Sequence, residues 1–127
     1  MMRKEKVLLV EDAPDMQMIV RATIGKDCDL SLAGSVAEAE KLLSGDDFDL
    51  MLLDVVLPDG SGFDYCQKLR SRAVTKSLPI FFLTGQDEVE QKVMGFELGG
   101  DDYIVKPFEP NEFRARVFGR LKRSGSA

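Results

Sequence analysis

Along the chain, short apolar runs alternate with longer segments whose apolar residues recur at helical spacing. The runs occupy residues 7–10, 30–33, 50–53, 80–83 and 103–105. Three of these runs are almost entirely apolar, which is typical of strands that are buried on both faces of a parallel sheet. The pattern therefore predicts five strands, each followed by a helix.

The segments between the runs carry helix signals. The start signals are, in chain order, Pro14, the capping box of Ser35 and Glu38, Ser61 with Asp64, Asp87 with Glu90, and Pro110. The apolar residues expected to share a helix face are Met16, Val20 and either Thr23 or Ile24; Ala39, Leu42 and Leu43; Val89, Val93 and Phe96; and Phe113, Val117 and Leu121. Gly99 and Gly100 are expected to end the fourth helix.

Five strands that alternate with five helices form a βα repeat. Such a repeat folds as an α/β three-layer sandwich, in which helices cover both faces of a parallel five-stranded sheet. Binding sites in these sheets form at the edge where the strands end. We expect a single domain over residues 1–123, followed by a short flexible tail or the start of a linker over residues 124–127.

Composition excludes several classes of function. The chain of 127 residues is 44% hydrophobic and carries a formal net charge of −5, which argues against direct nucleic-acid binding by this domain. Its basic residues do concentrate late, and we interpret them as a solvated helix face: Arg114, Arg116, Arg120, Lys122 and Arg123. No apolar run approaches the length of a membrane span or a signal peptide. We therefore expect no membrane partner and a cytoplasmic location.

The chain contains no histidine, and its two cysteines, Cys28 and Cys66, lack the spacing of a metal-binding motif. This composition excludes a zinc site built from cysteine and histidine, and it excludes a histidine general base. We expect both cysteines to be reduced in the cytosol.

Polar side chains stand at the carboxyl ends of four of the five predicted strands. They are Glu11 and Asp12 after the first, Asp54 after the third, Thr84 after the fourth and Lys106 after the fifth. Each residue alone has an ordinary structural explanation, such as a helix cap, a turn or a surface charge. Together they are poorly explained in this way. Helix capping does not require that Asp54 follow four apolar residues, and it does not require a second acid beside Asp12.

Three carboxylates on one edge would repel one another and lose solvation, and a divalent cation removes that cost. Oxygen ligands without histidine or cysteine favour a hard ion, Mg²⁺ or Mn²⁺. Because Mg²⁺ keeps several waters, the site leaves room for a phosphate oxygen, and Lys106 with Thr84 would complete a phosphate cradle. A carboxylate can attack phosphorus, and Asp54 is the best nucleophile because its strand is central in the expected sheet.

Four stretches together closely resemble the receiver domain of two-component response regulators. They are VLLVEDAP (7–14), DLMLLDVVLPDGSGFD (49–64), PIFFLTG (79–85) and GGDDYIVKPFEPNEF (99–113), in order and at compatible spacing. The resemblance covers nearly the whole chain. It implies a flavodoxin-like (βα)5 fold with the strand order 2-1-3-4-5.

The resemblance also implies a role for each site residue. Asp54 would accept a phosphoryl group from a histidine kinase or a phosphotransfer protein. Asp12 would bind Mg²⁺ directly and Glu11 more through water, and the backbone carbonyl of Val56 would be a further ligand. Lys106 would pair with Asp54 and then with the phosphoryl group. The domain would not be an enzyme in the ordinary sense, because it would catalyse only its own phosphoryl transfer and autodephosphorylation.

A switch and an output surface follow from the same resemblance. Thr84 would move to bond the phosphoryl group, and the Tyr103 ring would turn inward into the vacated space. The readout would be the surface of the fourth helix, the fifth strand and the fifth helix, where the charges placed for a homodimer are Lys92, Asp102, Glu112 and Arg116. Phe118 stands there where a basic residue is expected. The bond between Lys106 and Pro107 is expected to be cis.

Three alternative functions fit these residues less well. A phosphatase of the haloacid-dehalogenase type also uses an aspartate nucleophile and Mg²⁺, but its second aspartate would stand where this chain has Val56. A flavin mononucleotide carrier would need a phosphate loop after the first strand, where this chain has Glu-Asp-Ala-Pro. A phosphorylation-silent interaction domain would not need the complete set of site residues.

The sequence does not name the kinase or the output. The residues after 123 are too few to form an effector domain. We therefore expect either a single-domain regulator or a piece of a longer regulator whose effector domain could bind DNA.

Overall fold

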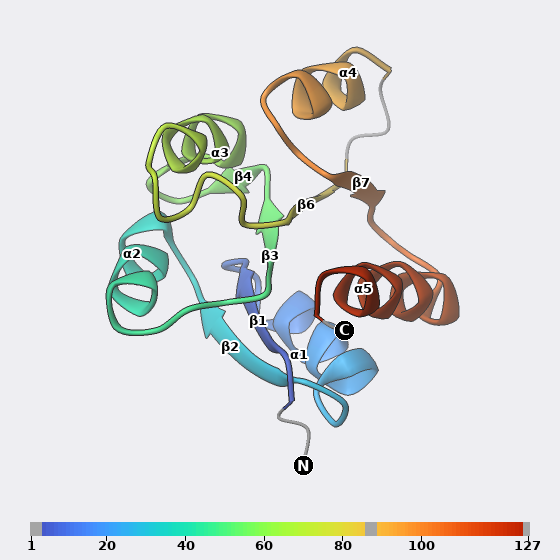
Figure 1. Cartoon of the computed structure of the whole chain (residues 1–127). Helices are drawn as coiled ribbons and strands as arrows, with labels where there is room; N and C mark the ends of the chain where they lie inside the picture. Colours follow the sequence, from blue (N-terminus) through green and yellow to red (C-terminus); the bar gives the residue numbers. More distant parts are fainter. Residues whose placement is uncertain (1–3, 86–88, 126–127) are drawn as a thin grey trace.

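The computed structural model describes residues 4–85 and 89–125 and contains a parallel sheet of five strands (Figure 1). The strands are β1 (Lys6–Val10), β2 (Asp29–Ala33), β3 (Leu50–Asp54), β6 (Ile80–Thr84) and β7 (Asp102–Val105). Their spatial order is β2-β1-β3-β6-β7. Because β6 and β7 are the fourth and fifth strands of this sheet along the chain, the predicted order is confirmed.

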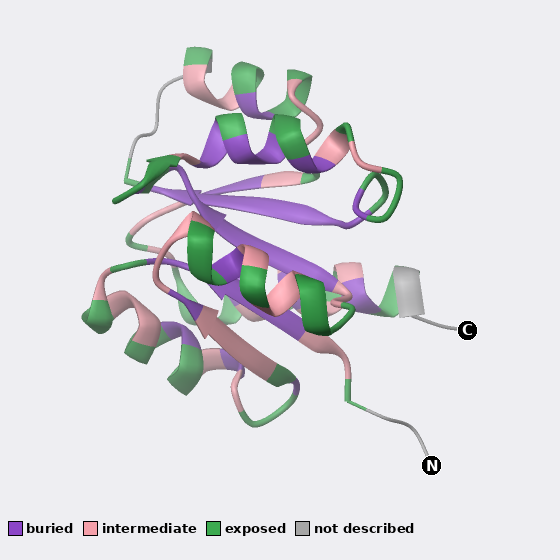
Figure 2. Ribbon diagram, turned by 90° about the vertical axis from the view of Figure 1, so that its left-hand side faces the viewer, coloured by how far each residue is buried: buried purple, intermediate pink, exposed green. Residues whose placement is uncertain are grey.

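Helices cover both faces of the sheet and produce the predicted three layers. They are α1 (Pro14–Ile24), α2 (Val36–Gly45), α3 (Gly62–Arg70), α4 (Val89–Glu97) and α5 (Pro110–Gly125). The helices α1 and α5 pack on one face, and α2 and α3 pack on the other (Figure 1). Figure 2 shows the central strands buried along their length, whereas the edge strand β2 is only half-buried.

The local signals place most helices correctly. The Ser35 hydroxyl accepts a hydrogen bond from the Glu38 N–H at 3.1 Å, and a Glu38 side-chain oxygen accepts one from the Gly34 N–H at 2.9 Å. Ser61 caps α3 by accepting from the Phe63 N–H at 3.1 Å. On α1, Ile24 rather than Thr23 joins the core. The predicted faces of α2 and α5 also pack inward, with Ala39, Phe113, Val117 and Leu121 buried.

The predicted apolar face of α4 is wrong, because it faces solvent. The side chains of Val93 and Phe96 are 48% and 50% exposed, and the buried position is Gly95. A Cβ atom at Gly95 would lie 3.1 Å from the Phe82 ring, so the helix approaches the sheet through a residue without a side chain. The predicted start signal at Asp87 lies outside the described residues.

Two further features differ from the sequence pattern. A short antiparallel hairpin of β4 (Val56–Leu57) and β5 (Gly60–Ser61) separates β3 from α3. In addition, α5 extends to Gly125, two residues past the predicted end of the domain. Both cysteines are free and buried. Among the described residues, no helix has the length and apolar character needed to span a membrane.

Candidate functional site

The parallel sheet brings the predicted polar residues to one edge. Glu11 and Asp12 directly follow β1, Asp54 and Thr84 are the last residues of β3 and β6, and Lys106 directly follows β7. Because the strands pair in parallel and in register, these four strand ends meet at the same edge. The predicted constellation is therefore present in space.

Three carboxylates form the centre of this edge. One oxygen from each of Glu11, Asp12 and Asp54 lies within 4.8 Å of the others. Glu11 and Asp54 are only 1% and 6% exposed, whereas Asp12 is exposed to solvent. The set fits a hard divalent cation such as Mg²⁺, because it offers oxygen ligands on one side and access for water ligands on the other.

Lys106 supplies the positive charge that balances the buried acids. Its Nζ donates to Glu11 Oε1 at 2.8 Å and to Asp54 Oδ2 at 3.3 Å. The predicted pairing with Asp54 is thus present, but the shorter bond goes to Glu11, which the sequence did not indicate. The Lys106 backbone N–H also bonds the Thr84 carbonyl at 2.7 Å, and the peptide bond to Pro107 is cis, as predicted.

Electrostatic shifts follow from this burial. Burial raises the pKa of Glu11, and the neighbouring Asp54 raises it further, against the opposing effect of Lys106. Burial also disfavours the charge of Lys106, but its hydrogen bond to Glu11 and the negative charges of Asp54 and Glu11 prevail, so the net pKa of the ammonium is raised. The site therefore holds a firmly protonated lysine and stores unfavourable negative charge that a bound cation would relieve.

The backbone around Asp54 is held closely. Asp54 Oδ1 accepts a hydrogen bond from the Val56 N–H at 3.1 Å, and the Gly62 N–H donates to the Val55 carbonyl at 2.7 Å. A Cβ atom at position 62 would collide with the carbonyl oxygen of Asp54. Gly62 is thus a site residue that the sequence reasoning missed, although a glycine directly after the predicted helix-start residue Ser61 is a signal that could have revealed it.

The predicted role of Val56 as a ligand through its carbonyl stays a prediction. The residue lies two positions after Asp54, in β4, and its side chain is exposed. Its backbone is therefore near the carboxylates, as the role requires.

Thr84 and Tyr103 are both buried, and their predicted switching role also stays a prediction. The Tyr103 side chain is only 5% exposed, and its ring centroid lies 6.4 Å from that of Phe82. The ring thus already points inward, which is the arrangement expected after the switch.

The charges predicted for a dimer interface bond within the chain. Arg116 binds Asp102 at 3.2 Å and Glu112 at 2.9 Å. Together with Lys92 and Tyr103, Glu112 and Arg116 line a hollow of about 380 Å³ between α4, β7 and α5. The other late basic residues are also partly paired, since Arg114 binds Asp27 at 3.0 Å and Arg120 lies 3.7 Å from Asp101.

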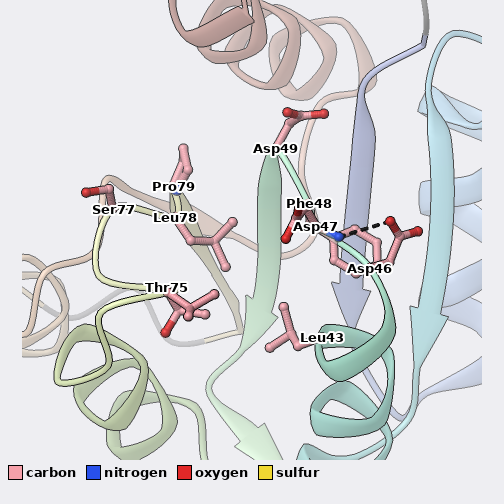
Figure 3. Close-up of a pocket in the computed structure, with 10 residues that line it drawn as sticks. Leu43, Asp46, Asp47, Phe48, Asp49, Thr75, Ser77, Leu78 and Pro79 are labelled. Atoms are coloured by element: carbon pink, nitrogen blue, oxygen red, sulfur yellow. Dashed lines mark hydrogen bonds between the residues drawn. The ribbon is translucent and has the colours of Figure 1, made fainter.

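A second acidic group lies at the opposite edge of the sheet, before β3 and β6. It surrounds a hollow of about 310 Å³ lined by Asp46, Asp47 and Asp49 together with apolar residues such as Leu43 and Leu78 (Figure 3). Asp49 Oδ2 accepts from the Lys6 N–H at 2.8 Å, and the Lys6 ammonium binds Asp46 at 2.7 Å. Asp46 and Asp49 are thus already engaged with neighbouring groups.

Comparisons with known proteins agree with the geometry of the edge that holds Asp54 and Lys106. The profile of the family described as "Response regulator receiver domain" matches residues 7–118. The chain is 39% identical over 122 residues to the phosphate regulon transcriptional regulatory protein PhoB of Rhizobium meliloti, covering 94% of this chain and 53% of that protein. It is 38% identical over 121 residues to the alkaline phosphatase synthesis transcriptional regulatory protein PhoP of Bacillus subtilis, covering 94% of this chain and 50% of that protein.

A solved structure extends the likeness to three dimensions. The non-phosphorylated HemR receiver domain from Leptospira biflexa superposes with a TM-score of 0.86 at 34% identity, covering 98% of this chain and 99% of that one. The chain thus spans about half the length of the two curated relatives named above and nearly the whole of a solved receiver domain.

Proposed function

Since the chain belongs to the response regulator receiver family, we propose that it is a phosphorylation-dependent signalling switch in which Asp54 accepts a phosphoryl group. The observation that carries this proposal is the buried Asp54 carboxylate, which lies within 4.8 Å of two further carboxylates and 3.3 Å from the Lys106 ammonium. The phosphoryl donor is a histidine kinase or a phosphotransfer protein.

In the proposed reaction, an oxygen of Asp54 forms the new bond to phosphorus. The bond from phosphorus to the donor histidine nitrogen breaks, and its electron pair stays on that nitrogen, which takes up a proton. A Mg²⁺ or Mn²⁺ ion held by Asp12, Asp54, the Val56 carbonyl and, through water, Glu11 would supply charge neutralisation for the phosphoryl oxygens. Lys106 adds a fixed positive charge because it keeps its proton between the acids.

The proposed readout is the surface of α4, β7 and α5. Thr84 lies at the end of β6 and would move to bond a phosphoryl oxygen, and Tyr103 on β7 would report its movement. A homodimer through this surface requires Arg116 to exchange its bonds to Asp102 and Glu112 for bonds to a second copy.

We place the domain in the cytoplasm, without activity on any substrate beyond its own phosphoryl group. The two curated relatives described above are transcriptional regulators. A longer form of this protein would accordingly carry an effector region that binds DNA, while the receiver domain itself would not.

The test is incubation with acetyl phosphate and Mg²⁺, followed by intact mass measurement. The wild type should gain the mass of one phosphoryl group, and Asp54→Asn should not. Asp47→Asn is the matched control, because it removes an exposed acid at the other edge of the sheet. An unmodified wild type, or equal labelling of Asp54→Asn, would contradict the proposal.

A further inference from the structure

The hairpin that follows Asp54 is too short to hold itself in place. Its strands β4 and β5 contain two residues each, and two-stranded hairpins are at best marginally stable in water. Leu57 anchors its middle in the core, but the tip residues Pro58, Asp59 and Gly60 are exposed. The position of the tip therefore depends on contacts with other elements.

Asp59 supplies such a contact. Its Oδ1 accepts a hydrogen bond from the Val36 N–H at 2.8 Å, and its Oδ2 accepts one from the Ala37 N–H at 3.0 Å. These donors are the first two N–H groups of α2, and they precede Asp59 by more than twenty residues in the sequence. The two bonds hold the pKa of Asp59 below its usual range, so it remains a carboxylate.

The helix α2 does not depend on Asp59 for its local cap. Ser35 already serves as the N-cap residue and accepts from the Glu38 N–H. The two caps differ in origin, because Ser35 belongs to the chain entering the helix and Asp59 belongs to the hairpin. The bonds of Asp59 thus join the helix to the segment that follows Asp54.

We infer that Asp59 is a positioning residue for the metal site: by fastening the hairpin tip to α2, it fixes the backbone of Val56. Val56 is three residues from Asp59 and pairs with Ser61 in the hairpin, while its N–H binds Asp54 Oδ1 at 3.1 Å. Anchored at Leu57 and at Asp59, the hairpin has little freedom to swing the Val56 carbonyl away from the acids. This inference rests on the proposed function, in which that carbonyl is a ligand.

The experiment measures Mg²⁺ affinity and amide hydrogen exchange in the full chain. The chain has no tryptophan, so binding is followed by titration calorimetry or by amide chemical shifts. Asp59→Ala should weaken Mg²⁺ binding about tenfold, the lower end of the losses seen when an outer partner of a metal site is removed. The Val56 amide should exchange faster together with those of Val36 and Ala37.

Three further variants separate positioning from other effects. Ser35→Ala weakens the same helix end without touching the hairpin, so its Mg²⁺ affinity should stay within about twofold of the wild type. Asp64→Ala removes an exposed acid from the first turn of α3 and controls for lost charge. Asp59→Asn keeps one accepting oxygen and should recover part of the affinity.

Two results overturn the inference. The first is wild-type Mg²⁺ affinity in Asp59→Ala although Val36 and Ala37 exchange faster, which would make Asp59 a helix cap and nothing more. The second is an equal loss of affinity in Asp59→Ala and in either Ser35→Ala or Asp64→Ala. A wild type that binds no Mg²⁺ overturns the proposed function itself, and the positioning role falls with it.

Discussion

Both edges of the sheet bring several carboxylates close to a lysine, yet only one edge has the geometry of a reactive site. The carboxyl edge holds Glu11, Asp12, Asp54 and Lys106, and the amino edge holds Asp46, Asp47, Asp49 and Lys6. The difference lies in burial. The side chains of Lys106 and Glu11 are 18% and 1% exposed, whereas those of Lys6 and Asp46 are 32% and 46% exposed.

This comparison shows that the number of charges does not make a site. At the amino edge the acids stand in loops and bind nearby backbone groups, as Asp46 does with the Asp47 N–H at 2.9 Å. At the carboxyl edge Asp54 ends a buried strand, so its carboxylate is largely removed from water. Within residues 4–85 and 89–125, the carboxyl edge alone brings three acidic ligand atoms within 4.8 Å of one another.

The strongest way to break the contrast is to remove the buried lysine. Lys106→Met leaves Glu11 and Asp54 without their cation, and the fold should lose about 2–4 kcal/mol of unfolding free energy at neutral pH without Mg²⁺. Urea unfolding with EDTA measures this loss. Added Mg²⁺ should stabilise the variant more than the wild type, because the ion then replaces the missing charge.

Lys6→Met is the matched control at the amino edge, and its unfolding free energy should respond to Mg²⁺ as the wild type does. Equal losses in the two variants would show that burial does not distinguish the two edges.

Sequence patterns sufficed for the carboxyl edge because strands buried on both faces leave a continuous apolar signal. The run ending at Asp54 and the run ending at Thr84 are buried throughout, and parallel pairing then brings their ends together without further information. The same reasoning predicted that Lys106 would lie at the edge that holds Asp54, whereas its pairing with Asp54 was implied by the resemblance to receiver domains. For these residues, the strand that each one follows is enough to predict which side chains lie close together.

Contacts that cross between elements could not be predicted in this way. The bonds from Asp59 to α2, and the preference of Lys106 for Glu11 over Asp54, depend on side-chain geometry rather than on a repeat in the sequence. The face of α4 that packs on the sheet was mispredicted for a similar reason. Gly95 packs against Phe82, so the apolar face that the periodicity indicates turns toward solvent.

A smaller effect that distinguishes the two edges is the pH dependence of stability caused by Glu11. Burial raises the pKa of Glu11 in the folded state above its ordinary value of 4.5. Between that value and the raised one, the folded state binds more protons than the unfolded state, so stability falls as the pH rises through this window. Glu11→Gln removes this component, and the effect should be smaller than that of Lys106→Met because Lys106 still balances Asp54.

The measurement is thermal unfolding of the wild type and Glu11→Gln in EDTA, from pH 4.5 to pH 7. The wild type should lose stability relative to the variant as the pH rises, and Mg²⁺ should reduce that difference. A relative stability that rises with pH would mean that Lys106 outweighs burial at this carboxylate.

The smallest expected effect belongs to the ion pair of Lys6 and Asp46. The Lys6 ammonium contacts both Asp46 carboxylate oxygens at 2.7 Å, but both side chains are about a third or more exposed. A double-mutant cycle with Lys6→Met and Asp46→Asn should give a coupling free energy below about 1 kcal/mol, and added salt should weaken it. Labelling by acetyl phosphate should be unchanged in all three variants. A coupling free energy of about 2 kcal/mol or more would contradict the distinction between the two edges, because the exposed ion pair would then act like the buried one. Altered labelling would contradict it as well, because the two edges would then be linked through β1.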